Sequence, residues 1–178
     1  YSKKPVIMDF GLAARLDMED VRVTQHGTLL GTRGEVPDDP DFTVPFGVAN
    51  ILREGTDVTV VAIAGSVPRA LAAAEEMAKE GVSVEVIDPR TLVPLDKETI
   101  LNSVGKTGRL VVADPAAKVC SAASEIMSIV GEEAFWDLQA PMQKVASKQV
   151  HIPFSPSLEK LVYPTSDDII ESIKKTLG

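Results

Sequence analysis

From residue 48 onward, the apolar positions of the chain follow two alternating patterns. Three apolar-rich runs are DVTVVAIAG (57–65), VSVEVI (82–87) and RLVVADPA (109–116), and the first of them is apolar on both faces. Such runs are typical of parallel strands that are covered by helices on both sides. After each run, apolar residues recur at helical spacing, so the pattern predicts strands and helices in alternation.

The first helix of this alternation has a single apolar stripe. The stripe consists of Val67, Ala70, Leu71, Ala74, Met77 and Ala78. Ser66 stands directly before it and is predicted to cap the start of the helix, because serine is among the preferred N-cap residues. Gly81 follows the stripe and is predicted to end the helix, since glycine readily adopts a left-handed conformation there.

Two further helices are predicted from similar signals. Asp96 is a good N-cap for a second helix, which is expected to end at Gly105. A third helix is predicted from Ser121 to about residue 130, with an interruption at Gly131. Both helices follow an apolar strand after a short connection, which predicts right-handed crossovers.

The last third of the chain is less regular. MQKVAS (142–147) predicts a weak fourth strand. Residues 151–164 are predicted to form an irregular, proline-rich connection. Thr165 or Ser166 is predicted to cap a final helix. The residues predicted to face inward from that helix are Ile169, Ile170, Ile173 and Leu177. Together the elements predict an α/β fold with three layers: a mostly parallel sheet with helices on both faces.

The N-terminal 46 residues differ from the rest of the chain. They are rich in glycine and proline, which indicates an irregular arm or linker (1–46) before the domain at 47–178. Asp38, Asp39 and Asp41 lie beside two prolines in this arm. We interpret these carboxylates as a solvated loop rather than a metal site, because cation-binding loops space their oxygen ligands more regularly.

Composition excludes several classes of protein. Of 178 residues, 44% are hydrophobic, and the net charge of −8 argues against nucleic acid or anionic membrane as a partner but suits a basic protein. The single cysteine, Cys120, excludes an internal disulfide and fits a reducing compartment. No apolar run reaches the roughly 20 residues of a membrane span. We therefore expect a soluble, cytoplasmic chain, although a mature organellar form would have the same composition.

Polar residues at the carboxyl ends of the predicted strands are candidates for a ligand site, since ligands bind there in open α/β sheets. Arg90 and the helix start at Ser66 offer one site for a small anion. The alternative, which we favour, is that Arg90 pairs with an aspartate and braces the loops. The aspartates within reach along the sequence are Asp88, Asp96 and Asp114.

Motifs for catalysis are scarce. Cys120 precedes a helix, where a thiolate is stabilised, but no histidine is near it in sequence, and we expect a small buried side chain instead. His26 and His151 are far apart and lie in no metal-ligand pattern. The chain has no G-x-S-x-G, Walker, H-E-x-x-H or G-x-G-x-x-G sequence. The residues alone therefore indicate a folding and assembly unit.

Five blocks carry a family resemblance. They are GEVPDDPDFTVPFG (34–47), REGTDVTVVA (53–62), VEVIDPRTLVPLD (84–96), KTGRLVVADPA (106–116) and HIPFSPSLEKLVYPT (151–165). In order and spacing they resemble the C-terminal domain of the β subunit of thiamine-diphosphate-dependent 2-oxo-acid dehydrogenases. This family covers pyruvate, branched-chain and acetoin dehydrogenases and is related to the transketolase C-terminal domain. The resemblance extends from about residue 29 to residue 178.

The resemblance implies a role in assembly. In this family the α subunit and the N-terminal half of the β subunit hold thiamine diphosphate and Mg²⁺, so this chain alone is expected to bind no cofactor and to be inactive. The C-terminal domain builds subunit contacts and docks a small basic domain of the acyltransferase, near the segment matching 138–141 and Gly178. An acidic residue is common in some relatives where Gln139 stands here. We also expect the chain to associate with copies of itself. The alternative function is a standalone oligomeric or engineered chimeric interaction module without an enzymatic role.

Further positions follow from the resemblance as loop or interface residues. These are Ser66, Asp88, Arg90, Asp96, Asp114 and Glu125. Glu125 is in the usual place of the family. Asp114 is followed by Pro115-Ala116, where the family usually has Glu-Ala, which implies altered packing of that loop.

Residues 5–32 resemble something else, namely the DFG segment and activation loop of a serine/threonine protein kinase. Asp9-Phe10-Gly11 would match the magnesium-binding motif. No glycine-rich loop, H-R-D or A-P-E sequence accompanies it, so kinase activity is not expected. The two interpretations are a chimera joined near residue 32 and a diverged family strand and loop with a chance DFG.

Overall fold

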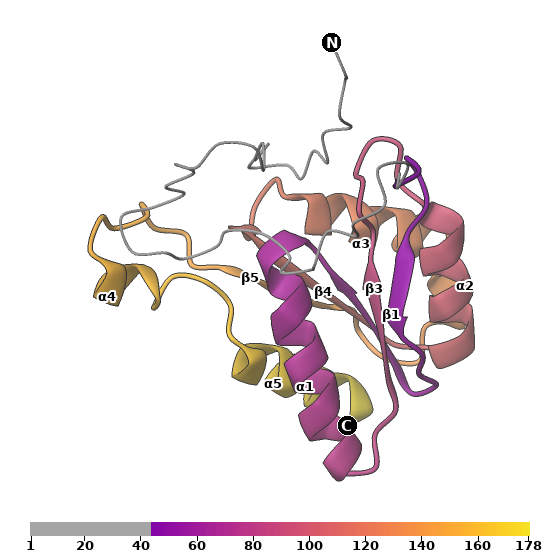
Figure 1. Cartoon of the computed structure of the whole chain (residues 1–178). Coiled ribbons are helices and arrows are strands. Elements are labelled where there is room, and N and C mark those ends of the chain that lie inside the picture. The colour runs from indigo at the N-terminus through magenta and orange to yellow at the C-terminus, as the bar shows by residue number, and fades with distance from the viewer. Residues whose placement is uncertain (1–43) are drawn as a thin grey trace.

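A computed structural model describes residues 44–178 of the chain. Its sheet has the strand order β1-β3-β2-β4-β5, in which β1 is antiparallel to β3 and the other pairs are parallel (Figure 1). The strands are β1 (Asn50–Arg53), β2 (Val58–Ala62), β3 (Val84–Asp88), β4 (Leu110–Ala117) and β5 (Gln143–Ser147).

Helices cover both faces of this sheet. The long helices are α1 (Val67–Lys79), α2 (Lys97–Thr107), α3 (Ala122–Glu133) and α5 (Ser166–Leu177). Short helical turns are η1 (Ala64–Ser66), η2 (Phe135–Asp137) and α4 (Pro156–Glu159). Helices α1 and α5 share one buried cluster with the sheet, and α2 and α3 share the other. The predicted three-layer α/β fold with a mostly parallel sheet is confirmed.

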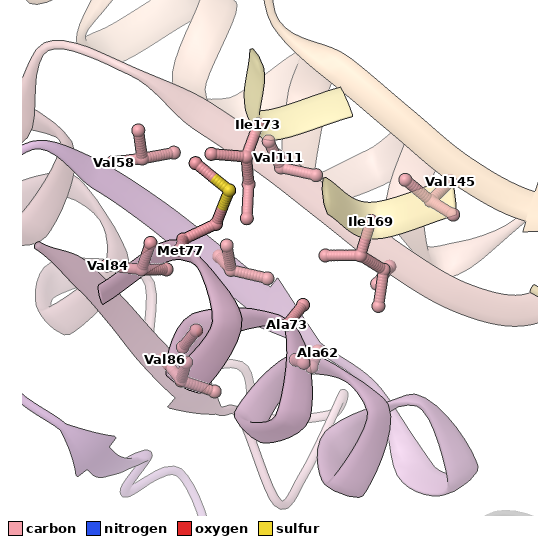
Figure 2. Packing of buried hydrophobic residues seen from close by; sticks show 14 of the residues in the cluster. Val58, Ala62, Ala73, Met77, Val84, Val86, Val111, Val145, Ile169 and Ile173 are labelled. Carbon is pink, nitrogen blue, oxygen red and sulfur yellow. The ribbon is translucent and has the colours of Figure 1, made fainter. Parts of the chain in front are cut away.

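Each face of the sheet has its own hydrophobic core. On the first face, Met77 of α1 lies among Val58, Val84 and Ile173 (Figure 2), and all four are at most 1% exposed. The second core is formed by Val61, Ile87, Ile100, Val104, Leu110, Val112, Ala123, Ile126, Val130 and Ala134. Burying each large apolar side chain stabilises the fold by about 1.5–3 kcal/mol. Burial on both faces explains why β2 and β4 read as continuous apolar runs.

A polar cluster interrupts the second face. Glu85 of β3 is 1% exposed, and its Oε2 accepts hydrogen bonds from the Lys106 ammonium and from the Gly55 N–H at 3.2 Å. Thr59 Oγ1 lies 2.6 Å from Ser103 Oγ, which ties β2 to α2. Burial acts to raise the pKa of Glu85, but hydrogen bonds from Lys106, Ser103 and Gly55 outweigh it and lower the pKa. The carboxylate is therefore ionised and joins β3, α2 and the turn before β2.

Several predicted helix ends are confirmed and others are wrong. Asp96 caps α2, with Oδ1 accepting from the Thr99 N–H at 3.1 Å. The second helix does not end at Gly105 but continues to Thr107, because the left-handed Gly108 (φ 68°) ends it. Helix α3 likewise continues through Gly131 to Glu133. A glycine inside a helix costs about 1 kcal/mol, which burial of the helix face offsets here.

The final helix, α5, is capped as predicted by Thr165, which forms a reciprocal capping box with Asp168. Ile169 and Ile173 are buried, but Leu177 is a wrong prediction, since it is exposed in the last turn of α5. Strand β1 was not predicted. Ile51 and Leu52 are adjacent and both exposed, so the strand lacks the alternation that marks a half-buried strand.

The expectations for the arm at 1–46, for its aspartates and for the kinase-like segment at 5–32 fall outside the described residues, apart from 44–46. Within 44–178, no helix combines the length and apolar character that crossing a membrane requires.

Candidate functional site: the strand ends and the Gly108 corner

The carboxyl ends of three parallel strands carry strained backbone. Ala64 after β2, Arg90 after β3 and Cys120 after β4 have φ values of 47°, 56° and 53°. A positive φ is uncommon for residues other than glycine and costs about 1–2 kcal/mol. Each of these loops therefore turns sharply where the chain leaves the sheet, at the edge where the sequence predicts a site.

Asp96 organises the loop after β3. Its Oδ2 accepts from the Ala49 N–H at 2.9 Å and from Thr99 Oγ1 at 2.8 Å. Thr91 Oγ1 accepts from the Gly47 N–H at 2.9 Å and donates to the Pro94 carbonyl at 2.8 Å. Burial acts to raise the pKa of Asp96, but its N–H and hydroxyl donors outweigh burial and lower the pKa. The loop is thus tied to the segment before β1.

Asp114 organises the loop after β4 in the same way. The carboxylate is buried and accepts from the Ala116 N–H at 2.8 Å and from the Ala123 N–H at 3.1 Å, in the first turn of α3. Ser147 Oγ of β5 donates to the Pro115 carbonyl. Glu125 lies exposed in the same first turn. The altered Asp-Pro-Ala sequence therefore still closes its loop through the aspartate.

The predicted ion pair between the Arg90 guanidinium and an aspartate is wrong. Asp96 and Asp114 bind backbone N–H groups, and Asp88 accepts from the Arg90 N–H at 2.9 Å. The Arg90 side chain is exposed and forms no ion pair with a residue of 44–178. The aspartates brace the loops through the main chain, so the guanidinium is not needed for this.

Ser66 is at the predicted position but does not cap with its side chain. It is fully buried, has helical backbone angles, and its Oγ lacks a hydrogen-bond partner. The Ser66 N–H donates to the Ile63 carbonyl, and the Val67 N–H donates to the Ala64 carbonyl. Pro68 has no backbone N–H. An anion at a helix start needs free N–H groups. The start of α1 offers too few free N–H groups for the anion site predicted at Ser66 and Arg90.

The remaining candidates are Cys120 and possible metal ligands. Cys120 is exposed and lies in a left-handed turn, so the expected burial of this thiol is wrong. Among residues 44–178, no three His, Cys, Asp or Glu side chains gather closely enough to hold a metal ion. At this edge of the sheet, Asp96 and Asp114 bind main-chain N–H groups of the loops.

Gln139, one of the two predicted docking positions, and the last turn of α5, which precedes the other position at Gly178, both bond to one corner, which we call the Gly108 corner (Gly108, Arg109, Gln139 and Thr176). The Gln139 N–H donates to the Gly108 carbonyl at 2.8 Å, and Arg109 Nε donates to the Thr176 carbonyl at 2.8 Å. A Cβ on Gly108 would lie 2.7 Å from Gln139 Cδ. The segment at Gln139 and the last turn of α5, two residues before Gly178, thus lie on either side of one turn.

An aromatic pair next to this corner was only partly anticipated. Phe135 and Trp136 are 57% and 93% exposed, with ring centroids 5.1 Å apart in an edge-to-face arrangement. Asp137 follows them, and its Oδ2 lies 3.8 Å from where a Gly105 Cβ would be. Sequence reasoning identified an apolar surface at Phe135 but missed Trp136. The signal was present, since it is the only tryptophan and stands between acidic residues.

Comparison with known proteins identifies a family and several relatives with similar sequences. The model of the transketolase C-terminal domain matches residues 47–169. The β subunit of acetoin:2,6-dichlorophenolindophenol oxidoreductase from Cupriavidus necator is 44% identical over 161 residues, which are 90% of this chain and 47% of that protein. The pyruvate dehydrogenase E1 component β subunit of Leifsonia xyli is 47% identical over 147 residues, 82% of this chain and 43% of that protein. The chain spans about half the length of these relatives.

A solved structure is also similar. It is described as a split gene transketolase, inactive beta4 tetramer, and superposes with a TM-score of 0.67 at 30% identity over 82% of this chain and 47% of that chain.

The same comparisons give the kinase-like segment no support. The acetoin oxidoreductase β subunit of Bacillus subtilis is 40% identical over 167 residues, 94% of this chain and 48% of that protein. Of 178 residues, 167 are matched and 11 remain, fewer than the 28 of segment 5–32. The chain belongs to the transketolase C-terminal domain family, with β subunits of acetoin and pyruvate dehydrogenases among its relatives.

Proposed function

We propose that the chain is the non-catalytic C-terminal part of the β subunit of an acetoin or 2-oxo-acid dehydrogenase, and that it serves subunit assembly and docking of the acyltransferase component. Thiamine diphosphate and Mg²⁺ are held by the α subunit and by the other half of the β subunit. This assignment is supported by the length of the relatives, which are about twice as long as the chain.

The observation that carries the docking role is the exposure of Trp136. A tryptophan that is 93% exposed, stacked edge-to-face on Phe135, is the kind of aromatic anchor that dominates binding energy in protein interfaces. Asp137 and Glu132 flank it, and Glu133 is paired with Lys97 at 2.8 Å. Aromatic rings beside carboxylates suit a basic partner, because arginine and lysine bind both. Gln139 lies three residues away, at the Gly108 corner.

The test is binding of the small basic domain of an acetoin dehydrogenase acyltransferase to the full chain by calorimetry. Trp136→Ala is expected to weaken binding at least about tenfold, as a central anchor does. Asp137→Asn is expected to reduce the salt dependence of the affinity. The matched control is Phe154→Ala, another fully exposed aromatic on a different surface, which leaves the affinity unchanged. Equal affinity of the wild type and Trp136→Ala contradicts the assignment of this surface.

The non-catalytic role has its own test. Titration of the full chain with thiamine diphosphate and Mg²⁺ is expected to give no binding heat. Binding at micromolar affinity would contradict this part of the proposal and leave the docking test unaffected.

Self-association belongs to the same proposal. It is supported by the similar structure whose description is an inactive beta4 tetramer, since that β chain assembles with copies of itself.

A further inference from the structure

The segments that follow the four parallel strands share a charge pattern. Directly after β2, β3, β4 and β5 come residues 63–69, 89–95, 118–124 and 148–154. Each segment contains one arginine or lysine and no aspartate or glutamate, and these cations are Arg69, Arg90, Lys118 and Lys148. Because the carboxyl ends of parallel strands meet at one edge of a sheet, the four residues lie along a single edge, which we call the basic edge.

The cations of the basic edge form no ion pair with any residue of 44–178. Three of them are exposed and Arg69 is half-buried. The carboxylates of Asp96 and Asp114 accept from main-chain N–H groups instead. Further acidic residues occur only in the first turns of the helices, where carboxylates interact favourably with the helix N-terminus: Glu98, Glu125, Asp167 and Asp168.

The opposite edge of the sheet has the opposite charge. The segments that precede the same strands are 54–57, 80–83, 108–109 and 134–142, and their acidic residues are Glu54, Asp57, Glu80 and Asp137. Their one basic residue, Arg109, donates to the Thr176 carbonyl. Charges are largely screened beyond about 8 Å at physiological ionic strength. A group that approaches the basic edge is therefore attracted or repelled mainly by its cations, although the whole chain has a net charge of −8.

We propose that the basic edge binds an extended acidic segment of another protein. This inference goes beyond the proposed function. It also uses the edge of the sheet opposite to Trp136 and the Gly108 corner, so either proposal can fail alone.

The spacing of the cations favours an extended segment over a small anion. Neighbouring strands lie about 4.8 Å apart, and the order β3-β2-β4-β5 makes the four loops span about 14 Å. A single carboxylate or phosphate cannot contact cations over that length. An extended chain advances about 3.4 Å per residue, so about four residues pass all four loops. Side chains at alternate positions of such a chain point to the same side, which predicts carboxylates at every other position.

Exposed apolar side chains accompany the cations. Phe46 and Val93 are 74% and 83% exposed. They lie in adjoining loops beside Arg90, since a Cβ on Gly47 would be 3.0 Å from Pro94 Cγ. Val119, which follows Lys118, is 58% exposed. The acidic segment is therefore expected to have an apolar residue between its carboxylates.

The test is a titration of the ¹⁵N-labelled full chain with a synthetic peptide, followed by amide chemical shifts at low salt. The peptide has glutamate at every other position and threonine or valine between them. Four exposed charge pairs, each contributing up to about fivefold in affinity, correspond to a dissociation constant of about 1–2 mM. The shifts are expected to change most at 89–93 and 118–120, and the same peptide with glutamine in place of glutamate is expected not to bind.

A variant with Arg90→Gln, Lys118→Gln and Lys148→Gln is expected to bind the acidic peptide at least about tenfold more weakly. The matched control has Lys79→Gln, Lys174→Gln and Lys175→Gln. It undergoes the same change in net charge away from the basic edge, and its affinity is expected to change less than about twofold. Circular dichroism checks that both variants fold.

Three results would overturn the proposal. The first is equal weakening in the two variants, which would make net charge the cause. The second is shift changes that lie elsewhere in the wild type, a readout that needs no variant to fold. The third is tighter binding of a thymidine oligonucleotide of the same length at the same salt concentration, which would replace the acidic protein segment by a nucleic acid.

Discussion

Lys106→Met is expected to destabilise the fold more than Glu85→Gln, although lysine is the more exposed partner of the pair. The side chains of Lys106 and Glu85 are 41% and 1% exposed. Removing the lysine strands a buried carboxylate, whereas removing the carboxylate leaves an ammonium that can turn to solvent or to Glu54, 3.4 Å away. Stability therefore depends on which partner is removed.

The magnitudes follow from what each variant leaves unpaired. A stranded buried charge costs about 3–5 kcal/mol. The Gly55 N–H remains bonded to Glu85, and water can enter where Lys106 was, so we expect about 2–3 kcal/mol for Lys106→Met. Glu85→Gln keeps an acceptor for Gly55 and loses only the ionic part, about 1–2 kcal/mol.

The pH dependence gives the experiment a second readout. The pKa of Glu85 is below its ordinary 4.5 in the folded chain, so its contribution is complete above that value and is lost as pH falls through the folded pKa. In Lys106→Met the burial of Glu85 is no longer offset by the ammonium, so its pKa rises and protonation at low pH relieves the penalty. The difference between wild type and Lys106→Met therefore shrinks from pH 7 to pH 4.

Urea unfolding followed by circular dichroism at both pH values measures these free energies. The reasoning is refuted if Glu85→Gln loses as much stability as Lys106→Met at pH 7, or if the effect of Lys106→Met is as large at pH 4.

Two other substitutions are informative. Gly55→Ala is expected to cost at least about 3 kcal/mol in urea unfolding, because the new Cβ would lie 2.2 Å from the backbone nitrogen of Glu85; Gly65→Ala is its control, with no atom within 4 Å of the Cβ, and a large loss there would contradict the steric argument. Asp96→Ala is expected to cost about 1–2 kcal/mol through the lost helix cap. Since the pKa of Asp96 is lowered, this cost is complete at pH 7 and disappears in acid, and a constant cost across pH would contradict the assigned role.

Local signals were sufficient at two of the predicted helix starts, although not at Ser66. Asp96 and Thr165 could be identified as caps because a side-chain oxygen reaches an N–H two or three residues later. The glycine rule failed at Gly105 and Gly131, because packing of α2 and α3 on the sheet outweighs the small intrinsic cost of glycine. The buried strands were predictable, since burial on both faces leaves an apolar run.

Contacts between distant segments were beyond the reach of sequence patterns. The Gly108 corner joins residues 108 and 139 and residues 109 and 176, and no local signal encodes these pairs. The resemblance alone placed Gln139 and Gly178 on one surface. Arg90 was assigned to an aspartate because charge is visible in a sequence, whereas the backbone N–H groups that actually bind Asp96 and Asp114 are present at every residue.

Residues 149–161, which we call the 149–161 loop, lie between β5 and α5, and the hydrogen bond that closes this loop has a consequence for how such a protein can diverge. Because the Lys148 N–H and the Val162 carbonyl meet at 3.0 Å, the loop could be exchanged for one of another length while β5 and α5 stay in place. Neither core loses a side chain in that exchange. Mutations in the loop can therefore accumulate without destabilising the two cores. Evolution can in this way change what the loop binds while the fold of the domain stays the same.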